Sequence, residues 1–396
     1  MAGDGPRASG ALPPEFTKEA VAAASEQGFR PYVPFLASGE PYRSMLANNP
    51  WLAAPDPRQP LEWGKGWYYD TTVARKHPDW RHVALPGPTK DLERMRHDLH
   101  EWGYCLIEDG LSREQCDRMR LRLAEQAQAE RELGIAYLTP WFQILWALAN
   151  KGDDFVGCLE HDPTSVQAGP VVEQLLAETL GPGWISYSFV SNIAFPGCHP
   201  QGLHQDQSAI VPFQSPEAPV LMNTLYVMQD VDETNGGTLF IPGSHRLLSE
   251  AGSGGAVGEL PRPINLEAPA GTIMVFDGRM LHGTGINRSD RWRYIMTQSN
   301  VKPWLRQQEN WVLMLRPEVL EKASPKLLRR LGFQSMNPYM INEGRCRRVG
   351  PLTPEMVRTL GPDAFTLQEV QGELDERRSP GLARRMRELP PNLPEG

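Results

Sequence analysis

Residues 219–244 read PVLMNTLYVMQDVDETNGGTLFIPGS, and this stretch decides the fold class. Apolar and β-branched residues at 219–229 and 237–242 are typical of strands, and Asn235-Gly236-Gly237 between them favours a hairpin-type turn. A second turn signal, Pro242-Gly243-Ser244, follows the second strand. Short strands joined by such turns, with no helix between them, indicate a sandwich or jelly roll and argue against a parallel sheet.

The strand-and-turn pattern continues on both sides of this stretch, and helical spacing appears beyond it. Further strands are predicted at 104–107, 184–195, 208–213, 272–277 and 292–301. Helices are predicted at 92–102, at 112–123 with Ser112 as its cap, at 171–180, and in the tail at 316–331, 354–360 and 366–376. We therefore expect a mainly β protein with flanking helices and a jelly-roll or cupin-like core at about 184–302.

Composition divides the chain into four parts. Residues 1–27 begin with a small, polar, Pro/Gly-rich stretch and are predicted to be a mobile N-terminal segment. Residues 28–88 are irregular and rich in tryptophan and proline, which predicts an extension that packs on the core; covering a pocket or contacting a second copy in a homodimer are the alternatives. Residues 89–340 form the main domain, and 341–396 are predicted to be a helical extension and tail.

Charge and cysteine usage exclude several classes of partner. The chain has 396 residues, a net charge of −8 and 22% charged residues, so no broad basic surface is expected for nucleic acid or an anionic membrane. No apolar run approaches the ~20 residues of a membrane span, and the start lacks the apolar region of a signal peptide. The five cysteines are scattered without paired spacing, which disfavours a disulfide framework or a zinc site and favours the cytoplasm. The expected partner is a small-molecule substrate.

A His-x-Asp motif, His204-Gln205-Asp206, is the first part of a candidate metal site. A bare motif of this kind is weak, because His77-Pro78-Asp79 is a second copy within the irregular aromatic region, where a structural role is expected. His204 instead follows a predicted strand and a turn and precedes further strands. Strand alternation would then aim the side chains of His204 and Asp206 in the same direction.

The third ligand has two candidates. His245 lies in the tight turn Ile241–Arg246, whereas His282 ends a strand-turn-strand run, so His282 is preferred. Two histidines and one carboxylate fill one triangular face of an octahedral metal and leave the opposite face open, which suits non-haem Fe(II) that binds a co-substrate and dioxygen. Three further histidines in helical or loop segments are predicted to be ordinary surface residues: His97, His100 and His161.

Arg293 indicates what the co-substrate is. It begins the predicted strand 292–301 and shares one face with Ile295 and Thr297. An arginine that points into a barrel is costly unless it meets an anion, and its planar guanidinium is a double donor for a carboxylate. A dicarboxylic co-substrate that chelates the metal at one end would place its other carboxylate at Arg293.

Taken in order, these motifs resemble the phytanoyl-CoA dioxygenase family of Fe(II)/2-oxoglutarate oxygenases. The matching stretches are QGLHQDQ (201–207), DETNGGT (232–238), IPGSHR (241–246), HGTG (282–285) and NRSDR (287–291), with weaker likeness at Trp102-Gly103-Tyr104 and Leu111-Ser112. The resemblance covers about 90–335 and leaves the aromatic segment and the tail beyond about 340 unexplained.

The resemblance implies a double-stranded β-helix in which His204, Asp206 and His282 bind Fe(II) and Arg293 holds the C5 carboxylate of 2-oxoglutarate. Dioxygen would be the second co-substrate, with ascorbate as a supporting reductant. Three polar residues match positions that touch the co-substrate in some relatives, with a purely structural role as the alternative: Gln201, Thr238 and Thr284.

Several reactions of the same site and three other protein classes are alternatives to hydroxylation of a small metabolite or natural-product intermediate. Related halogenases carry a small residue in place of Asp206, so the presence of Asp206 favours hydroxylation. Desaturation and cyclisation are alternatives because they use the same chemistry. An acyl-thioester substrate is also an alternative, although the negative net charge of the chain disfavours it. A cupin-like metalloenzyme of another reaction class would not need Arg293. A non-catalytic cupin-like metal-binding protein would be expected to lose a ligand or the arginine, and all four are present. A zinc hydrolase is disfavoured because the sequence shows no helical His-x-x-x-His motif. Five aromatic residues are predicted to belong to the core or to line a pocket: Trp141, Phe142, Tyr187, Phe189 and Tyr226.

Overall fold

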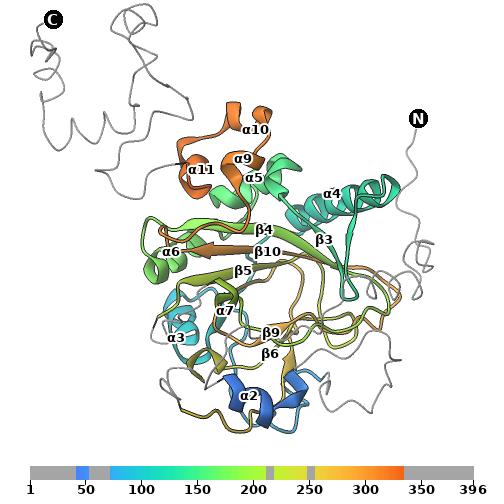
Figure 1. Cartoon of the computed structure of the whole chain (residues 1–396), viewed down its shortest axis with the longest axis vertical. Helices are drawn as coiled ribbons and strands as arrows, with labels where there is room; N and C mark the ends of the chain where they lie inside the picture. Colours follow the sequence, from blue (N-terminus) through green and yellow to red (C-terminus); the bar gives the residue numbers. More distant parts are fainter. Residues whose placement is uncertain (1–41, 53–71, 211–217, 248–254, 334–396) are drawn as a thin grey trace, which may run out of the picture. The chain divides into compact units, whose positions relative to one another are not determined.

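The computed structural model describes residues 42–52, 72–210, 218–247 and 255–333 (Figure 1). Contacts divide the chain into one unit up to Arg330 and a second from Leu331 onwards. The elements described below all belong to the first unit. The predicted N-terminal segment 1–27 and the predicted helices 354–360 and 366–376 lie outside the described residues.

Two antiparallel sheets form the centre of the first unit. The larger has the strand order β1-β8-β5-β10-β4-β3-β2, and the smaller has the order β7-β6-β9. In Figure 1, β4, β10 and β5 lie on one side of the interior and β6 and β9 on the other. The strands are β1 Tyr104–Ile107, β2 Tyr137–Leu138, β3 Gln143–Leu145, β4 Ile185–Ala194, β5 Leu221–Val227, β6 Leu239–Phe240, β7 Ile264–Asn265, β8 Ile273–Asp277, β9 His282–Gly283 and β10 Arg293–Val301.

The path of the chain between the two sheets identifies the core as a double-stranded β-helix. From β4 in the larger sheet the chain crosses to the smaller sheet, where His204 forms an antiparallel bridge with His282. It returns to the larger sheet in β5, forms β6 and β7 in the smaller sheet, and then alternates through β8, β9 and β10. This alternation confirms the predicted jelly-roll core and the mainly β class with flanking helices.

The helices cover the sheets from outside, and two of them, α3 and α4, begin at side-chain caps. The side chain of Asp91 accepts from the backbone N–H groups of Glu93 and Arg94 at the start of α3, and Ser112 forms a capping box with Gln115 at α4. Figure 1 shows α4, α5 and α9–α11 on the same side of the larger sheet. The helices are α2 Tyr42–Asn48, α3 Leu92–Trp102, α4 Arg113–Glu132, α5 Asp153–Glu160, α6 Gly169–Leu180, α7 Asp206–Ile210, α9 Trp311–Met314, α10 Pro317–Lys322 and α11 Pro325–Arg330.

Two predicted elements are wrong. The strand expected at 208–213 is replaced up to Ile210 by the helix α7. The side chain of Gln207 accepts from the backbone N–H groups of Val220 and Leu221 at the start of β5, and these bonds hold the segment beside β5 instead of in a sheet. Residues 211–213 lie outside the described residues. The single helix expected at 316–331 is two helices, since Pro325 has no N–H to continue α10.

The described parts of the aromatic extension, 42–52 and 72–88, pack against the core. Trp51 and Trp80 are buried in the same apolar cluster as residues of the smaller sheet, and the indole N–H of Trp80 donates to the carbonyl of Arg262 at 2.8 Å. Val73 forms a parallel bridge with Asn265 of β7. The described part of this segment therefore forms an outer layer on the smaller sheet.

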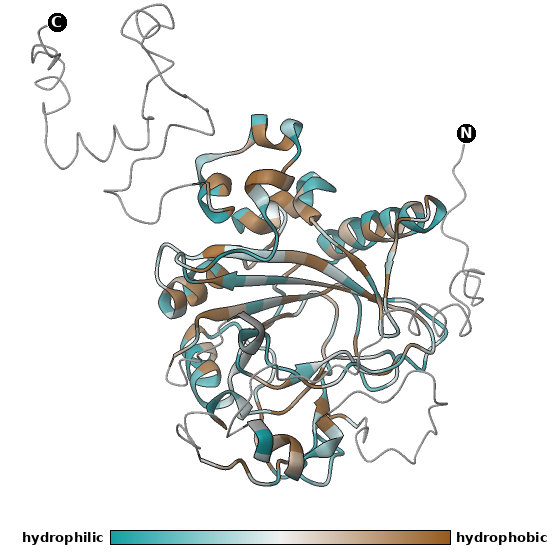
Figure 2. Cartoon of the chain, in the orientation of Figure 1, coloured by the Kyte–Doolittle hydropathy of each residue, from teal (hydrophilic) through white to brown (hydrophobic). Residues whose placement is uncertain are grey.

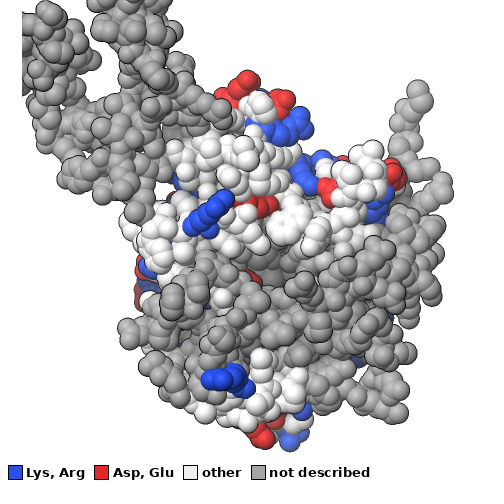
Figure 3. All heavy atoms as spheres, in the orientation of Figure 1, with Lys and Arg blue, Asp and Glu red and all other residues white. Residues whose placement is uncertain are grey.

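Polar residues occur along the strands of the larger sheet as well as on the surface. Figure 2 shows both brown and teal residues along the strands of the larger sheet, so that sheet is not purely apolar. On the face drawn in Figure 3, the described Lys and Arg side chains are scattered among Asp and Glu. No described helix has the length and hydropathy that crossing a bilayer requires.

Candidate metal centre

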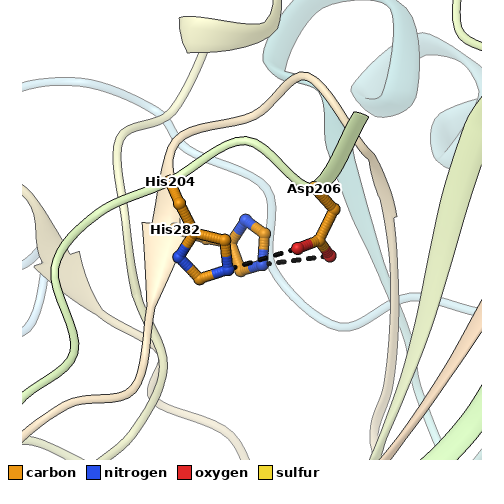
Figure 4. Close-up of side chains that lie close together, drawn as sticks. All are labelled: His204, Asp206 and His282. Carbon is orange, nitrogen blue, oxygen red and sulfur yellow. Dashed lines mark ion pairs between the residues drawn. The ribbon is translucent and has the colours of Figure 1, made fainter. Parts of the chain in front are cut away.

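The fold brings His204, Asp206 and His282 together at one point of the interior (Figure 4). One ligand atom from each residue lies within 4.8 Å of the others. His204 Nε2 is 3.2 Å from Asp206 Oδ1, and His282 Nε2 is 3.5 Å from Asp206 Oδ2. Two imidazole nitrogens and a carboxylate at these separations can share a single metal ion.

Main-chain carbonyls set the orientation of both imidazole rings. His204 Nδ1 lies 3.1 Å from the carbonyl oxygen of Gly202, and His282 Nδ1 lies 3.0 Å from that of Met280. A carbonyl only accepts, so in each ring Nδ1 carries the proton and donates it. The lone pair of each Nε2 is thereby directed at the shared centre.

Asp206 reaches the centre by a different route from the one predicted. It is the first residue of α7, so strand alternation does not align it with His204. The segment is instead fixed to the turn after β8: Gln205 Nε2 donates to the carbonyl of Arg279, and the N–H of Gln207 donates to that of Gly278 at 2.9 Å. These bonds on either side of Asp206 turn its carboxylate towards the histidines.

The centre is electrostatically suited to a cation. Burial opposes ionisation of Asp206, but the two histidines outweigh it and hold the pKa of this carboxyl well below its ordinary value. For His282, burial lowers the pKa, and the attraction of the Asp206 carboxylate overcomes this effect and raises it. A divalent ion with Nε2 ligands would supply the positive charge that the carboxylate attracts.

Arg293 is a buried cation with unsatisfied donors. Its side chain is fully buried, and Nη1 donates weakly to the carbonyl of Asn192 at 3.4 Å. Nε and Nη2 have no hydrogen-bond partner among the described residues. Burial lowers the pKa of Arg293 to about 10, so it remains charged at neutral pH. Two donor nitrogens without a described partner on a buried charge fit an anionic ligand such as the carboxylate of 2-oxoglutarate.

A cavity of about 220 Å³ lies next to the three candidate ligands. Ile295 and Thr297, which share the inward face of β10 with Arg293, line it. The structure places all three polar residues of the sequence hypothesis in its wall: Gln201, Thr238 and Thr284. The Thr284 N–H and hydroxyl face Gln201 Oε1 at 3.3 and 3.4 Å, so these two side chains also hold each other.

The five aromatic residues considered from the sequence divide between cavity and core. Phe142 and Tyr187 line the cavity, together with Trp146. Phe189 and Tyr226 are fully buried and lie near each other, with ring centroids 6.2 Å apart. Trp141 is half-buried and is not among the described lining residues.

The other histidines lie away from the centre. His77 is buried and its Nδ1 accepts from the N–H of Asp79, which makes His77-Pro78-Asp79 a local turn. His245 lies in the turn after β6, and its ring contacts α3, with Nε2 3.1 Å from the carbonyl oxygen of His100. The prediction that His161 is a surface residue is wrong: it is 1% exposed, because it ends α5 and packs on the ring of Trp184 at 5.4 Å.

Two residues of the site were missed from the sequence. Asn223 Nδ2 donates to Asp206 Oδ2 at 2.9 Å, and the hydroxyl of Ser299 donates to Asn223 Oδ1 at 2.7 Å. Both lie on strands that were predicted, β5 and β10. The available signal was a polar residue at an inward position of a buried strand, where a partner is required.

A family model and several sequence relatives all indicate that this chain is similar to dioxygenases. The family model for phytanoyl-CoA dioxygenase (PhyH) matches residues 99–295. The chain is 30% identical over 244 residues to dioxygenase af480 of Aspergillus fumigatus, covering 60% of this chain and 76% of that protein. It is 23% identical over 279 residues to the Fe(II)/2-oxoglutarate-dependent dioxygenase nvfF of Aspergillus novofumigatus, covering 67% and 90%. It is also 30% identical to dioxygenase FUM3 of Gibberella moniliformis, but spans only 47% of that relative.

Among solved structures, the chain is similar to the α-ketoglutarate-dependent carbocyclase SnoK from nogalamycin biosynthesis, with 17% identity and a TM-score of 0.45 over 61% of this chain and 95% of that one. The sequence relatives and the family model identify the family of this chain. The chain belongs to the phytanoyl-CoA dioxygenase family and is a dioxygenase that depends on Fe(II) and 2-oxoglutarate.

Proposed function

We propose that this enzyme hydroxylates a small, uncharged organic metabolite and decarboxylates 2-oxoglutarate to succinate and CO₂. One atom of dioxygen enters the substrate as a hydroxyl group and the other enters succinate, so the reaction balances without a further reductant. The observation that carries the proposal is the carboxylate of Asp206 between two Nε2 atoms, beside a cavity. A retained carboxylate fills the position that chloride would need for halogenation.

Each part of the site has a proposed role. His204, Asp206 and His282 hold Fe(II), which supplies activation of dioxygen when bound. Arg293 binds the C5 carboxylate of 2-oxoglutarate through its orphaned N–H groups. Contacts to the co-substrate from nearby polar side chains complete the proposal: Gln201, Thr238 and Thr284.

The walls of the cavity support an uncharged substrate. Phe142, Trp146 and Tyr187 form an aromatic part, and Asn192 and Gln308 add amide groups that donate and accept hydrogen bonds. No Lys or Arg occurs among the described lining residues. Apart from Arg293, which is assigned to 2-oxoglutarate, a phosphorylated acyl thioester has no described cationic partner at the cavity. An apolar molecule with a few oxygen atoms has both apolar surfaces and hydrogen-bond partners.

The test is turnover with defined components. The metal-free protein is reconstituted with Fe(II), ascorbate and 2-oxoglutarate, and succinate is measured with a panel of uncharged metabolites. A product that gains one oxygen atom supports hydroxylation, whereas loss of two hydrogens identifies desaturation or cyclisation. His204→Ala should abolish succinate formation while the circular dichroism spectrum is retained. Absence of both succinate formation and 2-oxoglutarate binding in the wild-type protein would overturn the proposal.

A further inference from the structure

A hydrogen-bonded chain of three side chains leads from β10 to the metal centre. Ser299 on β10 and Asn223 on β5 are register partners on neighbouring strands. The Ser299 hydroxyl donates to Asn223 Oδ1 at 2.7 Å, and Asn223 Nδ2 donates to Asp206 Oδ2 at 2.9 Å. Asn223 is fully buried and Ser299 is 8% exposed, so water does not compete freely for these bonds.

The chemistry of the groups fixes the direction of each bond. An ionised carboxylate accepts only, so the amide of Asn223 must present Nδ2 to Asp206. Its oxygen is then directed at Ser299, whose hydroxyl can donate to it.

We infer that Asn223 is a positioning residue that reserves one oxygen of Asp206 for the metal, with Ser299 locking the amide in place. This inference rests on the proposed metal site. The bond from Asn223 occupies Oδ2 and restrains rotation of the carboxylate, while Oδ1, 3.2 Å from His204 Nε2, receives no described amide donor.

The number of free coordination positions explains why this restraint matters. An octahedral ion held by two histidines and one carboxylate oxygen keeps three positions open. The co-substrate needs two of them for chelation, and dioxygen needs the third. If both oxygens of Asp206 bound the ion, only two positions would remain and the co-substrate and dioxygen would compete. Asn223 therefore acts on binding of the co-substrate without touching it.

The chain offers a matched control on the same two strands. Tyr226 of β5 donates its hydroxyl to Gln298 Oε1 of β10 at 3.0 Å, and both side chains are fully buried. Neither residue lines the cavity among its described walls. Tyr226→Phe thus removes a buried hydrogen bond between the same strands without removing a group from the metal centre.

The experiment uses the full-length metal-free protein with Co(II), which resists oxidation in air. Co(II) affinity, the visible spectrum of bound Co(II) and the affinity of the Co(II) protein for 2-oxoglutarate are measured for wild type, Asn223→Leu, Ser299→Ala and Tyr226→Phe. Asn223→Leu is expected to weaken 2-oxoglutarate binding about 10-fold or more and to change the Co(II) spectrum. Loss of an outer-shell partner lowers metal affinity or activity by about 10- to 100-fold at other metal sites. Ser299→Ala should act in the same direction and less strongly, and Tyr226→Phe should match wild type.

Two results would overturn the inference. The first is that Asn223→Leu keeps the 2-oxoglutarate affinity and the Co(II) spectrum of the wild type. The second is that Tyr226→Phe loses as much 2-oxoglutarate affinity as Asn223→Leu, which would mean that weaker strand pairing has a general effect. Should Asn223→Leu fail to fold, Ser299→Ala decides, because wild-type 2-oxoglutarate affinity in that variant contradicts the locked amide. Failure of the proposed function is distinguishable, since the wild-type protein itself would then bind no 2-oxoglutarate in the presence of metal.

Discussion

His204 and His282 are a hydrogen-bonded antiparallel pair: the N–H of His204 donates to the carbonyl of His282 at 2.9 Å, and the reverse bond measures 3.0 Å. Two residues far apart in the sequence are therefore held backbone to backbone at the edge of β9. Their ring centroids are 4.4 Å apart. The separation of the two Nε2 ligands thus depends on strand pairing rather than on flexible loops, which favours a preorganised metal centre.

Metal affinity should distinguish His282 from His245. His282→Ala removes one of three ligands and is expected to weaken Co(II) binding by more than about 100-fold, above the range for outer-shell partners. His245→Ala should bind Co(II) as wild type does, because its ring contacts the carbonyl of His100 and not the centre. Titration of both metal-free variants with Co(II) measures this; equal losses would contradict the assignment of ligands.

Arg293→Leu should separate stability from co-substrate binding. Removal of a buried charge with orphaned donors should leave the metal-free protein at least as stable in urea as wild type. Loss of the charge-assisted bonds should weaken 2-oxoglutarate binding by about 1.5–3 kcal/mol, or roughly 10- to 150-fold. Arg291→Leu is the control, since this side chain is 86% exposed. Calorimetric titration that shows equal affinity for Arg293→Leu and wild type would refute the carboxylate-binding role.

Glu309 should make stability depend on pH. Its carboxyl accepts from the N–H groups of Ala147 and Phe189, each at 2.6 Å, while burial raises its pKa to about 7 against the opposing effects of these bonds and of Lys151. The native state then binds the proton more tightly than the unfolded state. The unfolding free energy should therefore fall as the pH rises from about 4.5 to about 7, by roughly 3 kcal/mol at most.

Glu309→Gln tests this dependence, because an amide does not titrate. Urea unfolding is measured at several pH values between 5 and 7, and the unfolding free energy of the variant should change less with pH than that of the wild type. The absolute stability of the variant should be lower, since the amide nitrogen cannot accept the second N–H bond. An identical slope in both proteins would show that other groups account for the pH dependence.

Gly237→Ala should destabilise the β6 side of the core. A methyl group there would overlap the carbonyl oxygen of Leu266 and lie 2.8 Å from that of Asp232. Backbone atoms cannot move aside as a flexible side chain can, so a cost of about 1–3 kcal/mol is expected. Gly258→Ala has open space around it and should be neutral. The melting temperatures of the two variants are compared by thermal unfolding. Equal melting temperatures would contradict the close approach of the Leu266 and Asp232 carbonyl oxygens to Gly237.

The sequence alone determined the class of fold and predicted the residues of the candidate metal centre. Strands such as β5 and β10 were predictable because alternation and turn residues act locally. His204, Asp206, His282 and Arg293 were identifiable because few functions need those side chains in that order. Short strands such as β2 and β7, two residues each, were not, because they carry too few residues to show a period.

Only the tertiary structure decided how these residues meet. Asp206 lies on a helix, and nothing local in 204–210 shows it, because the bonds that fix the segment come from Arg279, Gly278 and the start of β5. Asn223 meets Ser299 because β5 and β10 pair in one register, and a shift by one residue would turn its side chain to the opposite face, away from Ser299 and Asp206. The side chains of the centre follow from local sequence, whereas their mutual support follows from pairing between strands that are distant in the chain.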